Sequence, residues 1–311
     1  MLRRLVEVDA RMAVAGEEDY PASLLDLADP PVALFVRGSA LVSLGPGVAV
    51  VGARNCSALG AEVAEGFGRG LAAAGLCVLS GGARGIDRAA HRGALAAGGG
   101  TVAVLGSGID VAYPTRNRSL LDRIVRAGAV VSEYPPGVPA QPYRFPARNR
   151  IVAAMAEAVL VVEGAAGSGS LITADHALDL GRPVFAVPGP VTSPLSETPL
   201  ALIRDGAGMV RVVDDLLEDL GRLDPRAAVG SVEEPRAAEA VPAGRPGVPS
   251  GLSELERRVL DTLSGPTLPE VVAATLDRRL PEVLAAVVGL EVRGLVRTVG
   301  GRVERRLGGG R

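Results

Sequence analysis

The stretch that decides the fold lies between residues 145 and 173 and reads FPARNRIV (145–152), AVLVV (158–162) and EGAAGSGSLIT (163–173). Its central part is a short apolar run rich in β-branched residues, which is typical of a parallel strand covered on both faces. A turn rich in glycine and serine follows, and a helical pattern runs from Ser170 to Leu180. The stretch therefore predicts a buried strand, a tight turn and a helix N-terminus in direct succession.

Polar residues lie on both sides of this predicted strand. The turn after it contains Ser168, Gly169 and Ser170, and unpaired backbone N–H groups at a helix N-terminus favour an anion such as phosphate. The segment before the strand holds an arginine cluster with an aromatic residue beside it: Phe145, Arg148, Asn149 and Arg150. A guanidinium group can bind two phosphate oxygens, and a phenyl ring can stack on a base. If both clusters face one crevice, they predict a nucleotide or a single-stranded nucleic acid as the ligand.

Apolar runs and helical patterns alternate from residue 48 to about residue 213. The runs are Val48–Val51, Leu76–Leu79, Val102–Leu105, Ala129–Val131, Val159–Val162 and Pro183–Val187. This alternation predicts an α/β fold with a doubly wound, Rossmann-like parallel sheet. Ligands of such sheets bind beyond the carboxyl ends of the strands. The residues directly after the runs are therefore candidate site residues, and they include Arg54, Ser80, Gly81 and Gly82.

The composition limits the possible functions. The chain of 311 residues is 48% apolar and has a formal net charge of −2, so any contact with nucleic acid would require a local basic patch. All 33 of its Lys+Arg positions are arginine, which excludes a phosphate-binding loop that uses a lysine and a Schiff-base mechanism. Cys56 and Cys77 have no partner at metal-ligand spacing, so we expect neither a metal nor another cofactor. The chain has no long apolar run, and we expect a cytoplasmic protein that does not enter a membrane.

The chain divides into four predicted segments. Residues 1–47 form a lead-in segment that packs on the sheet domain, and residues 48–221 form the Rossmann-like domain itself. Residues 222–250 lack periodicity and are rich in Pro, Ala, Gly and charged residues, as expected of a flexible linker. Residues 251–306 predict a small winged-helix-like domain, with helices at 253–263, 268–276 and 280–292 and two short strands around Gly300 and Gly301.

A series of motifs occurs in a characteristic order and spacing. They are GAR (52–54), SGGARGID (80–87), GSGID (106–110), SEYP (132–135), FPARNRI (145–151), SGSLITA (168–174) and VFAVPG (184–189). Together they resemble the DNA-processing protein DprA (Smf) family over roughly residues 18–212. Because so many motifs follow one another in the same order, the resemblance is specific rather than a likeness of fold alone.

The resemblance implies a cytoplasmic bacterial protein without enzymatic turnover. Such a protein would bind single-stranded DNA as a homodimer, protect incoming DNA and help to load the recombinase RecA in natural transformation. Transferred motif by motif, the implied DNA-binding residues are Arg54, Ser80, Gly81, Gly82, Phe145, Arg148, Asn149, Arg150, Ser168, Gly169 and Ser170. We expect binding to tolerate changes of base sequence, because arginines hold phosphates and a stacked phenyl ring does not read base identity.

Two features depart from the family's pattern. Family members usually begin with a small helical domain, whereas this chain starts almost directly at the segment that leads into the sheet. We expect that this domain has been lost or that the assigned start is too late. The usual Gly-Thr-Asn feature after the last glycine turn is replaced by residues 196–200, which read SETPL, and no role is transferred to them.

Two classes of enzyme are alternatives to this interpretation. Nucleotide phosphoribohydrolases have a similar sheet, in which a glycine turn holds phosphate and a carboxylate takes part in cleaving the glycosidic bond. No glutamate follows Ser170 before Asp175, which disfavours this chemistry. A dinucleotide-binding oxidoreductase is disfavoured because the turn after the first strand lacks the G-x-G-x-x-G spacing. Glu133 and Glu163 are interpreted as counter-charges that orient neighbouring arginines, and His91 as a packed, hydrogen-bonded residue.

Overall fold

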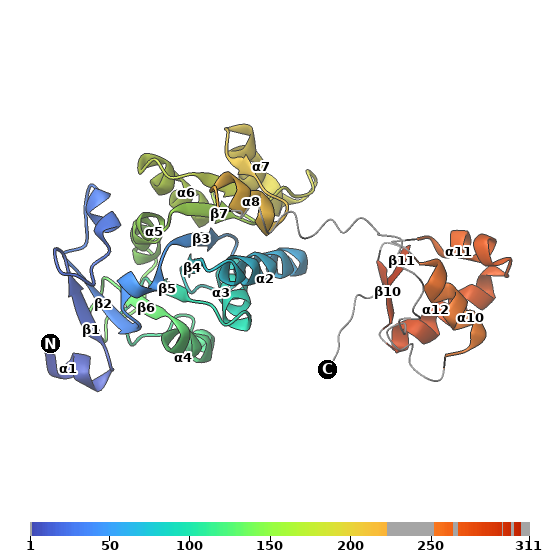
Figure 1. The fold of residues 1–311 in the computed structure, drawn as a ribbon, viewed down its shortest axis with the longest axis horizontal. Coiled ribbons are helices and arrows are strands. Elements are labelled where there is room, and N and C mark those ends of the chain that lie inside the picture. Colours follow the sequence, from blue (N-terminus) through green and yellow to red (C-terminus); the bar gives the residue numbers. More distant parts are fainter. Residues whose placement is uncertain (1, 223–251, 264–266, 294, 300–301, 306–311) are drawn as a thin grey trace, which may run out of the picture. The chain divides into compact units, whose positions relative to one another are not determined.

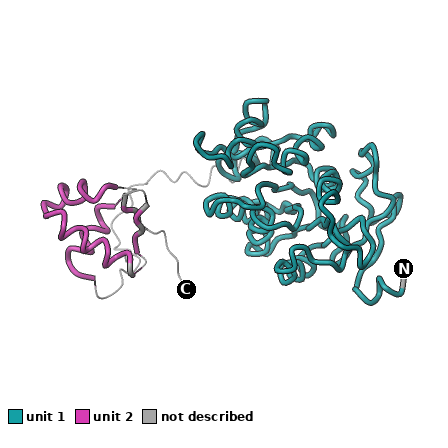
Figure 2. The backbone as a smooth tube through the Cα atoms, turned by 180° about the vertical axis from the view of Figure 1, so that it is seen from behind, with its two compact units in different colours: residues 1–232 teal, residues 233–311 magenta. Residues whose placement is uncertain are grey.

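The computed structural model describes residues 2–222, 252–263, 267–293, 295–299 and 302–305. Figure 1 shows the helices and strands of these residues, and Figure 2 shows two compact units, residues 1–232 and residues 233–311. The predicted linker, residues 222–250, lies outside the described residues except for Arg222.

The described strands of the larger unit form one sheet, which is mostly parallel (Figure 1). Its strands are β1 (Arg11–Val14), β2 (Ala33–Gly38), β3 (Gly47–Val51), β4 (Cys77–Ser80), β5 (Thr101–Leu105), β6 (Ala129–Ser132), β7 (Ala158–Val161), β8 (Val184–Ala186) and β9 (Gly208–Met209). They lie in the order β1-β2-β6-β5-β4-β3-β7-β8-β9. Only β1 with β2 and β2 with β6 pair in antiparallel fashion. The predicted α/β sheet is confirmed, and the segment before residue 48 adds two antiparallel strands, of which β1 forms the edge.

The chain covers both faces of this sheet with helices. One face carries α2 (Ala58–Ala73), α3 (Ile86–Ala96), α4 (Arg118–Ala127) and α8 (Val213–Asp219). The other face carries α5 (Arg144–Met155) and α6 (Gly169–Asp179), with η1 (Ala22–Asp26) beside α5. From β3 the chain proceeds outward to β6, and then α5 returns it to β7 on the other side of β3. The strand order therefore reverses between β3 and β7, and this reversal is where such sheets place their ligands.

The apolar runs become strands that are buried on both sides. In β3, Ala49 and Val51 belong to the core beneath α5, whereas Val48 and Val50 belong to the core beneath α2 and α3. This alternation follows from the two-residue period of a strand. Each face of the strand therefore has its own layer of helices.

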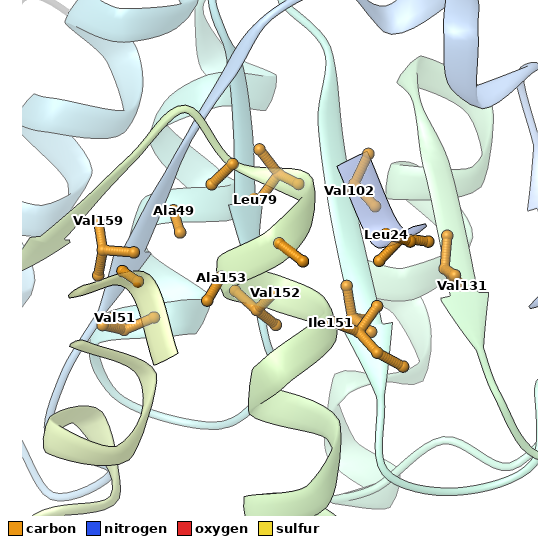
Figure 3. Packing of buried hydrophobic residues seen from close by; sticks show 14 of the residues in the cluster. Leu24, Ala49, Val51, Leu79, Val102, Val131, Ile151, Val152, Ala153 and Val159 are labelled. Atoms are coloured by element: carbon orange, nitrogen blue, oxygen red, sulfur yellow. The ribbon is translucent and has the colours of Figure 1, made fainter. Parts of the chain in front are cut away.

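Helix α5 is anchored to the sheet by its C-terminal half. Figure 3 shows Ile151, Val152 and Ala153 of α5 packed toward strand residues such as Val51 and Val102. All three α5 residues are at most 1% exposed. Because the C-terminal half of α5 is fixed in this way, the position of its N-terminal half, residues 144–150, at the sheet edge is fixed as well.

The smaller unit contains α10 (Glu254–Thr262), α11 (Pro269–Leu276), α12 (Leu280–Val292) and the antiparallel pair β10 (Val296–Val299) and β11 (Arg302–Arg305). Its helices pack on a common apolar cluster with Val296 and Val303 of the strands. Ser253 and Glu256 form the predicted capping box at α10. The elements follow one another in the predicted order. The Gly300-Gly301 turn lies outside the described residues, and the winged-helix assignment stays a prediction.

In the described part of the chain, no helix is long and apolar enough to span a membrane.

His91 of α3 is fully buried against the sheet. Its Nδ1 lies 2.7 Å from Thr101 Oγ1, and the Thr101 hydroxyl donates to the Val78 carbonyl oxygen at 2.6 Å. Since that hydroxyl proton is already engaged, Nδ1–H is the donor to the Thr101 oxygen. Burial, reinforced by the charge of Arg148, lowers the pKa of His91 to about 3. The interpretation of His91 as a packed, hydrogen-bonded residue is confirmed.

His91 should make the free energy of unfolding depend on pH. The unfolded chain binds a proton on this histidine near pH 6.5, whereas the native state does so only near pH 3. Its contribution to stability is therefore complete above pH 6.5 and is lost as the pH falls, at a rate approaching about 1.4 kcal/mol per pH unit. We expect His91→Gln to remove this slope between pH 6.5 and 5 in urea unfolding. The partly exposed His176 provides the control His176→Gln, and a slope that persists in His91→Gln would contradict the burial described here.

Candidate nucleic-acid interface

A crevice of about 490 Å³ lies at the carboxyl edge of the sheet. Its walls come from the turns after β3, β4 and β7 and from the N-terminal half of α5, so it occupies the reversal point of the strand order. Of the predicted site residues, the crevice lining includes Arg54, Gly81, Phe145, Arg148, Asn149, Ser168, Gly169 and Ser170. The folding of the sheet thus brings together residues that are more than 100 positions apart in the sequence.

A second cavity of about 270 Å³ continues the crevice. The two cavities share Arg54, Gly81, Ala83 and Phe145, and together we call them the groove. The second cavity adds two arginines and a tyrosine that were not among the predicted site residues: Arg84, Tyr113 and Arg116. Each lies in the segment that follows β4 or β5. The rule that ligands bind beyond the carboxyl ends of strands could therefore have predicted them as site residues.

Aromatic rings and an arginine meet where the two cavities join. The ring centroids of Phe145 and Tyr113 are 5.3 Å apart with 33° between the ring planes. The guanidinium carbon of the exposed Arg54 lies 4.8 Å from the Phe145 centroid, which is a cation–π distance. Phe145 is half-buried and Tyr113 is 50% exposed. This junction therefore offers ring faces and a positive charge to the same ligand.

Arg148 is the buried cation beneath the crevice, with only 4% of its surface exposed. Its Nη1 donates to the Gly81 carbonyl oxygen at 2.7 Å and also to the Val104 carbonyl oxygen. Its Nε donates to Asn149 Oδ1 at 3.2 Å. Burial lowers the pKa of Arg148 to about 10, so the side chain remains cationic at neutral pH. Arg148 therefore joins α5 to the ends of β4 and β5 and places a positive charge under the crevice.

Asp87, in the first turn of α3, balances this buried charge. Its Oδ2 accepts hydrogen bonds from the backbone N–H groups of Gly81 and Ala83, at 3.1 and 3.2 Å. Burial raises the pKa of Asp87, while the charge of Arg148 acts in the opposite direction. Of the two glycines predicted to contact DNA in this turn, Gly81 thus has its N–H already bound by a carboxylate of the chain itself.

Ser80 and Gly82 lie outside the groove lining. The Ser80 hydroxyl is fully buried and donates to the Val50 carbonyl oxygen at 2.7 Å. Gly82 has φ of 63° and its carbonyl oxygen accepts from Asn117 Nδ2 at 3.0 Å. Both residues shape the turn after β4, and of the three predicted residues in this turn only Gly81 reaches the groove.

Arg150 also lies outside the groove lining, although it is only two residues from Arg148. Its guanidinium forms two hydrogen bonds with the Glu133 carboxylate, at 2.7 and 3.1 Å, and lies 3.7 Å from Asp29. The predicted pairing of Glu133 with a neighbouring arginine is therefore confirmed. The same prediction was wrong for Glu163, whose carboxylate accepts from the Ser57 N–H and hydroxyl at the start of α2.

Ser168, Gly169 and Ser170 form the predicted turn at the start of α6. Ser168 is the N-cap residue, and its hydroxyl lies 2.9 Å from the Ser170 hydroxyl. The Gly169 carbonyl oxygen accepts from Asn149 Nδ2 at 3.1 Å, which fixes α5 against this turn. The N-terminus of α6 thus faces the crevice with its partial positive charge, which favours an anion there.

The matching family model, DNA recombination-mediator protein A, covers residues 11–221. The chain belongs to this family. It is 43% identical over 281 residues to the putative DNA processing protein DprA of Mycobacterium tuberculosis, covering 88% of this chain and 68% of that protein. It is 40% identical over 297 residues to protein Smf of Escherichia coli, covering 94% and 76%. Membership confirms the resemblance drawn from the motifs.

Solved structures of family members share the fold. The X-ray structure of DNA processing protein A from Streptococcus pneumoniae matches with a TM-score of 0.66 and 41% identity, covering 70% of this chain and 78% of that chain. The protein from Helicobacter pylori matches with a TM-score of 0.61 and 26% identity, covering 68% and 96%. That protein is described as having a unique mode of binding single-stranded DNA.

Within the described residues of the present chain, no group of His, Cys, Asp or Glu is placed to hold a metal ion.

Gly81→Ala should disturb the contact between Arg148 and the turn after β4. An added Cβ would clash with Arg148 Nη2 and lie 2.7 Å from Asp87 Oδ2, so we expect a loss of about 1–3 kcal/mol in the free energy of unfolding. Gly66→Ala is the matched control, because a Cβ on this exposed α2 residue meets no atom within 4 Å. The control should gain about 0.5–1 kcal/mol. Equal urea midpoints for the two variants would contradict the packing described around Arg148.

Proposed function

We propose that this chain binds single-stranded DNA in the groove and acts as a recombination mediator without catalytic turnover. The observation that supports it best is the junction of the two cavities, where Arg54, Phe145 and Tyr113 lie together above the buried charge of Arg148. Membership of the DNA recombination-mediator protein A family and the single-stranded DNA binding described for the Helicobacter pylori protein support the same ligand.

The phosphates of the strand would contact the cationic parts of the groove. Arg54 is exposed, so its guanidinium is available for a salt-dependent phosphate contact. The start of α6 at Ser168–Ser170 adds a neutral but electropositive surface. Asp87 already binds the N–H groups of Gly81 and Ala83, so these groups are not assigned to phosphate. Arg148 would act from beneath by fixing the crevice wall.

The bases of the strand would stack at the junction. The Phe145 and Tyr113 rings are partly exposed, and a ring face accepts any base because every base has a π-face. In a duplex the base faces are already stacked on each other and cannot reach these rings. The groove therefore favours a single strand over a duplex and tolerates changes of sequence.

We further propose that the chain works as a homodimer, protects incoming DNA and helps to load RecA in natural transformation. These proposals rest on the family resemblance of the motifs. Analytical ultracentrifugation of the full chain would test the dimer. RecA-dependent ATP hydrolysis on DNA coated with single-strand-binding protein would test loading, and no stimulation by the chain would contradict it.

Removing the ring at position 145 should weaken binding of single-stranded DNA. Base stacking contributes about 1–3 kcal/mol per base, so we expect Phe145→Ala to raise the Kd for labelled oligo-dT by roughly 5- to 100-fold in fluorescence anisotropy. Phe145→Tyr keeps the ring and should retain most of the affinity. Equal Kd values for the alanine and tyrosine variants would contradict stacking at this position.

Removing the Arg54 charge should change the salt dependence of binding. Loss of one phosphate contact lowers the slope of log K against log salt by about 0.7 for a single strand. We expect this change of slope in Arg54→Ala, together with a weaker affinity for the single strand at low salt.

Arg150→Ala in the same series tests the predicted DNA contact of Arg150, whose guanidinium is held by Glu133. If the wild-type chain binds no oligo-dT and instead releases free base from nucleoside monophosphates, the proposal fails in favour of the hydrolase alternative.

A further inference from the structure

A row of arginines leads away from the groove along α3 and α4. We call Arg84, Arg88, Arg116 and Arg123 the arginine row; all four are exposed. Within the described residues, none of them forms an ion pair or hydrogen bond, whereas other arginines of the same unit are paired with carboxylates. Exposed arginines that lack counter-charges form a local positive field on a chain whose net charge is −2.

The row begins inside the groove. Arg84 and Arg116 line the second cavity, which also contains Tyr113 and Phe145 of the stacking junction. Arg84 follows β4, and Arg116 lies in η3 (Thr115–Asn117), directly before α4. A strand stacked at the junction therefore meets these two guanidinium groups next.

Arg88 continues the row on the side of α3 that is nearest to α4. It precedes Leu95 by seven residues, or two helical turns, so both residues lie on one side of α3. Leu95 packs against the cluster that contains Leu120, Leu121 and Ile124 of α4. Arg88 therefore lies on the side of α3 that packs, through Leu95, against this cluster.

Arg123 continues the row on α4. Arg116 lies in η3 just before α4, and within α4 the exposed Arg123 follows the buried Leu120 by three residues, so these two are neighbours on the helix surface. Asp122, the one acidic residue of α4, is turned by about 100° from Arg123. It lies at four-residue spacing from Arg118 and Arg126, which is the spacing of neighbouring side chains on a helix surface.

We propose that the arginine row binds the sugar-phosphate backbone of the same strand as it leaves the groove, and so extends the DNA site across α3 and α4. This inference rests on the proposed function. The row offers guanidinium groups, which bind phosphate oxygens in pairs, and α3 and α4 carry no Phe, Tyr or Trp on which a base could stack. The contact between the arginine row and the backbone is therefore independent of base sequence, and it makes the salt dependence of DNA binding steeper.

A charge-matched pair of double variants tests the row. Arg88→Ala/Arg123→Ala removes two row charges that lie outside the groove lining. Arg204→Ala/Arg211→Ala removes two exposed arginines at the β8–β9 end of the sheet, at the end of α7 (Glu197–Arg204) and after β9. Both variants of the full chain have the same net charge, so a general effect of charge on DNA affinity is equal in the two.

Binding is measured by anisotropy with a short oligo-dT of about 5 nucleotides, which fills the groove only, and a long one of about 20 nucleotides. For the long strand, we expect the row variant to bind several-fold more weakly than the control and to lose about 1.4 from the salt slope. For the short strand, the two variants should bind equally.

Equal affinities of the two variants for the long strand would contradict DNA binding by the arginine row, but not DNA binding in the groove. A loss by the row variant that is the same for short and long strands would also overturn it, because the effect would then arise inside the groove. Failure of the wild-type chain to bind either strand would contradict the proposed function itself, and with it the row.

Discussion

The buried guanidinium of Arg148 is the interaction on which the site depends. It donates to the carbonyl oxygens of Gly81 and Val104 and thereby ties α5 to the ends of β4 and β5. An arginine that is 4% exposed is tolerated only where hydrogen bonds and an opposite charge offset its desolvation. Asp87 supplies that charge and also holds the turn after β4. This buried pair therefore fixes the shape of the crevice, while the exposed Arg54 supplies positive charge at its surface.

The fold adds the exposed contacts around this buried pair. The reversal of strand order between β3 and β7 brings Arg54 and the start of α6 into the lining of one crevice. The long connection after β5 carries Tyr113 to the ring of Phe145. The groove residues thus lie on turns of the sheet and on the start of α5, an arrangement that is already formed without a ligand.

Much of the fold could be predicted from the sequence, because the strands are uninterrupted apolar runs separated by helical patterns. The crevice turns could also be predicted, since they follow strand ends. The partners of individual side chains could not. Arg148 and Arg150 belong to the same motif, but as residues two positions apart they point about 200° away from each other around α5. Arg148 therefore enters the crevice wall, whereas Arg150 reaches Glu133. Ser80 and Glu163 likewise have partners, Val50 and Ser57, that only the tertiary structure brings near.

The path of the strand tests the account most directly. We would cross-link the full chain by ultraviolet light to an oligonucleotide that carries a photoreactive thymine analogue, and identify the modified residues by mass spectrometry. We expect adducts on Phe145 or Tyr113, whose rings meet at the junction of the two cavities. Efficient cross-linking confined to residues away from the groove, such as those of the smaller unit, would contradict it.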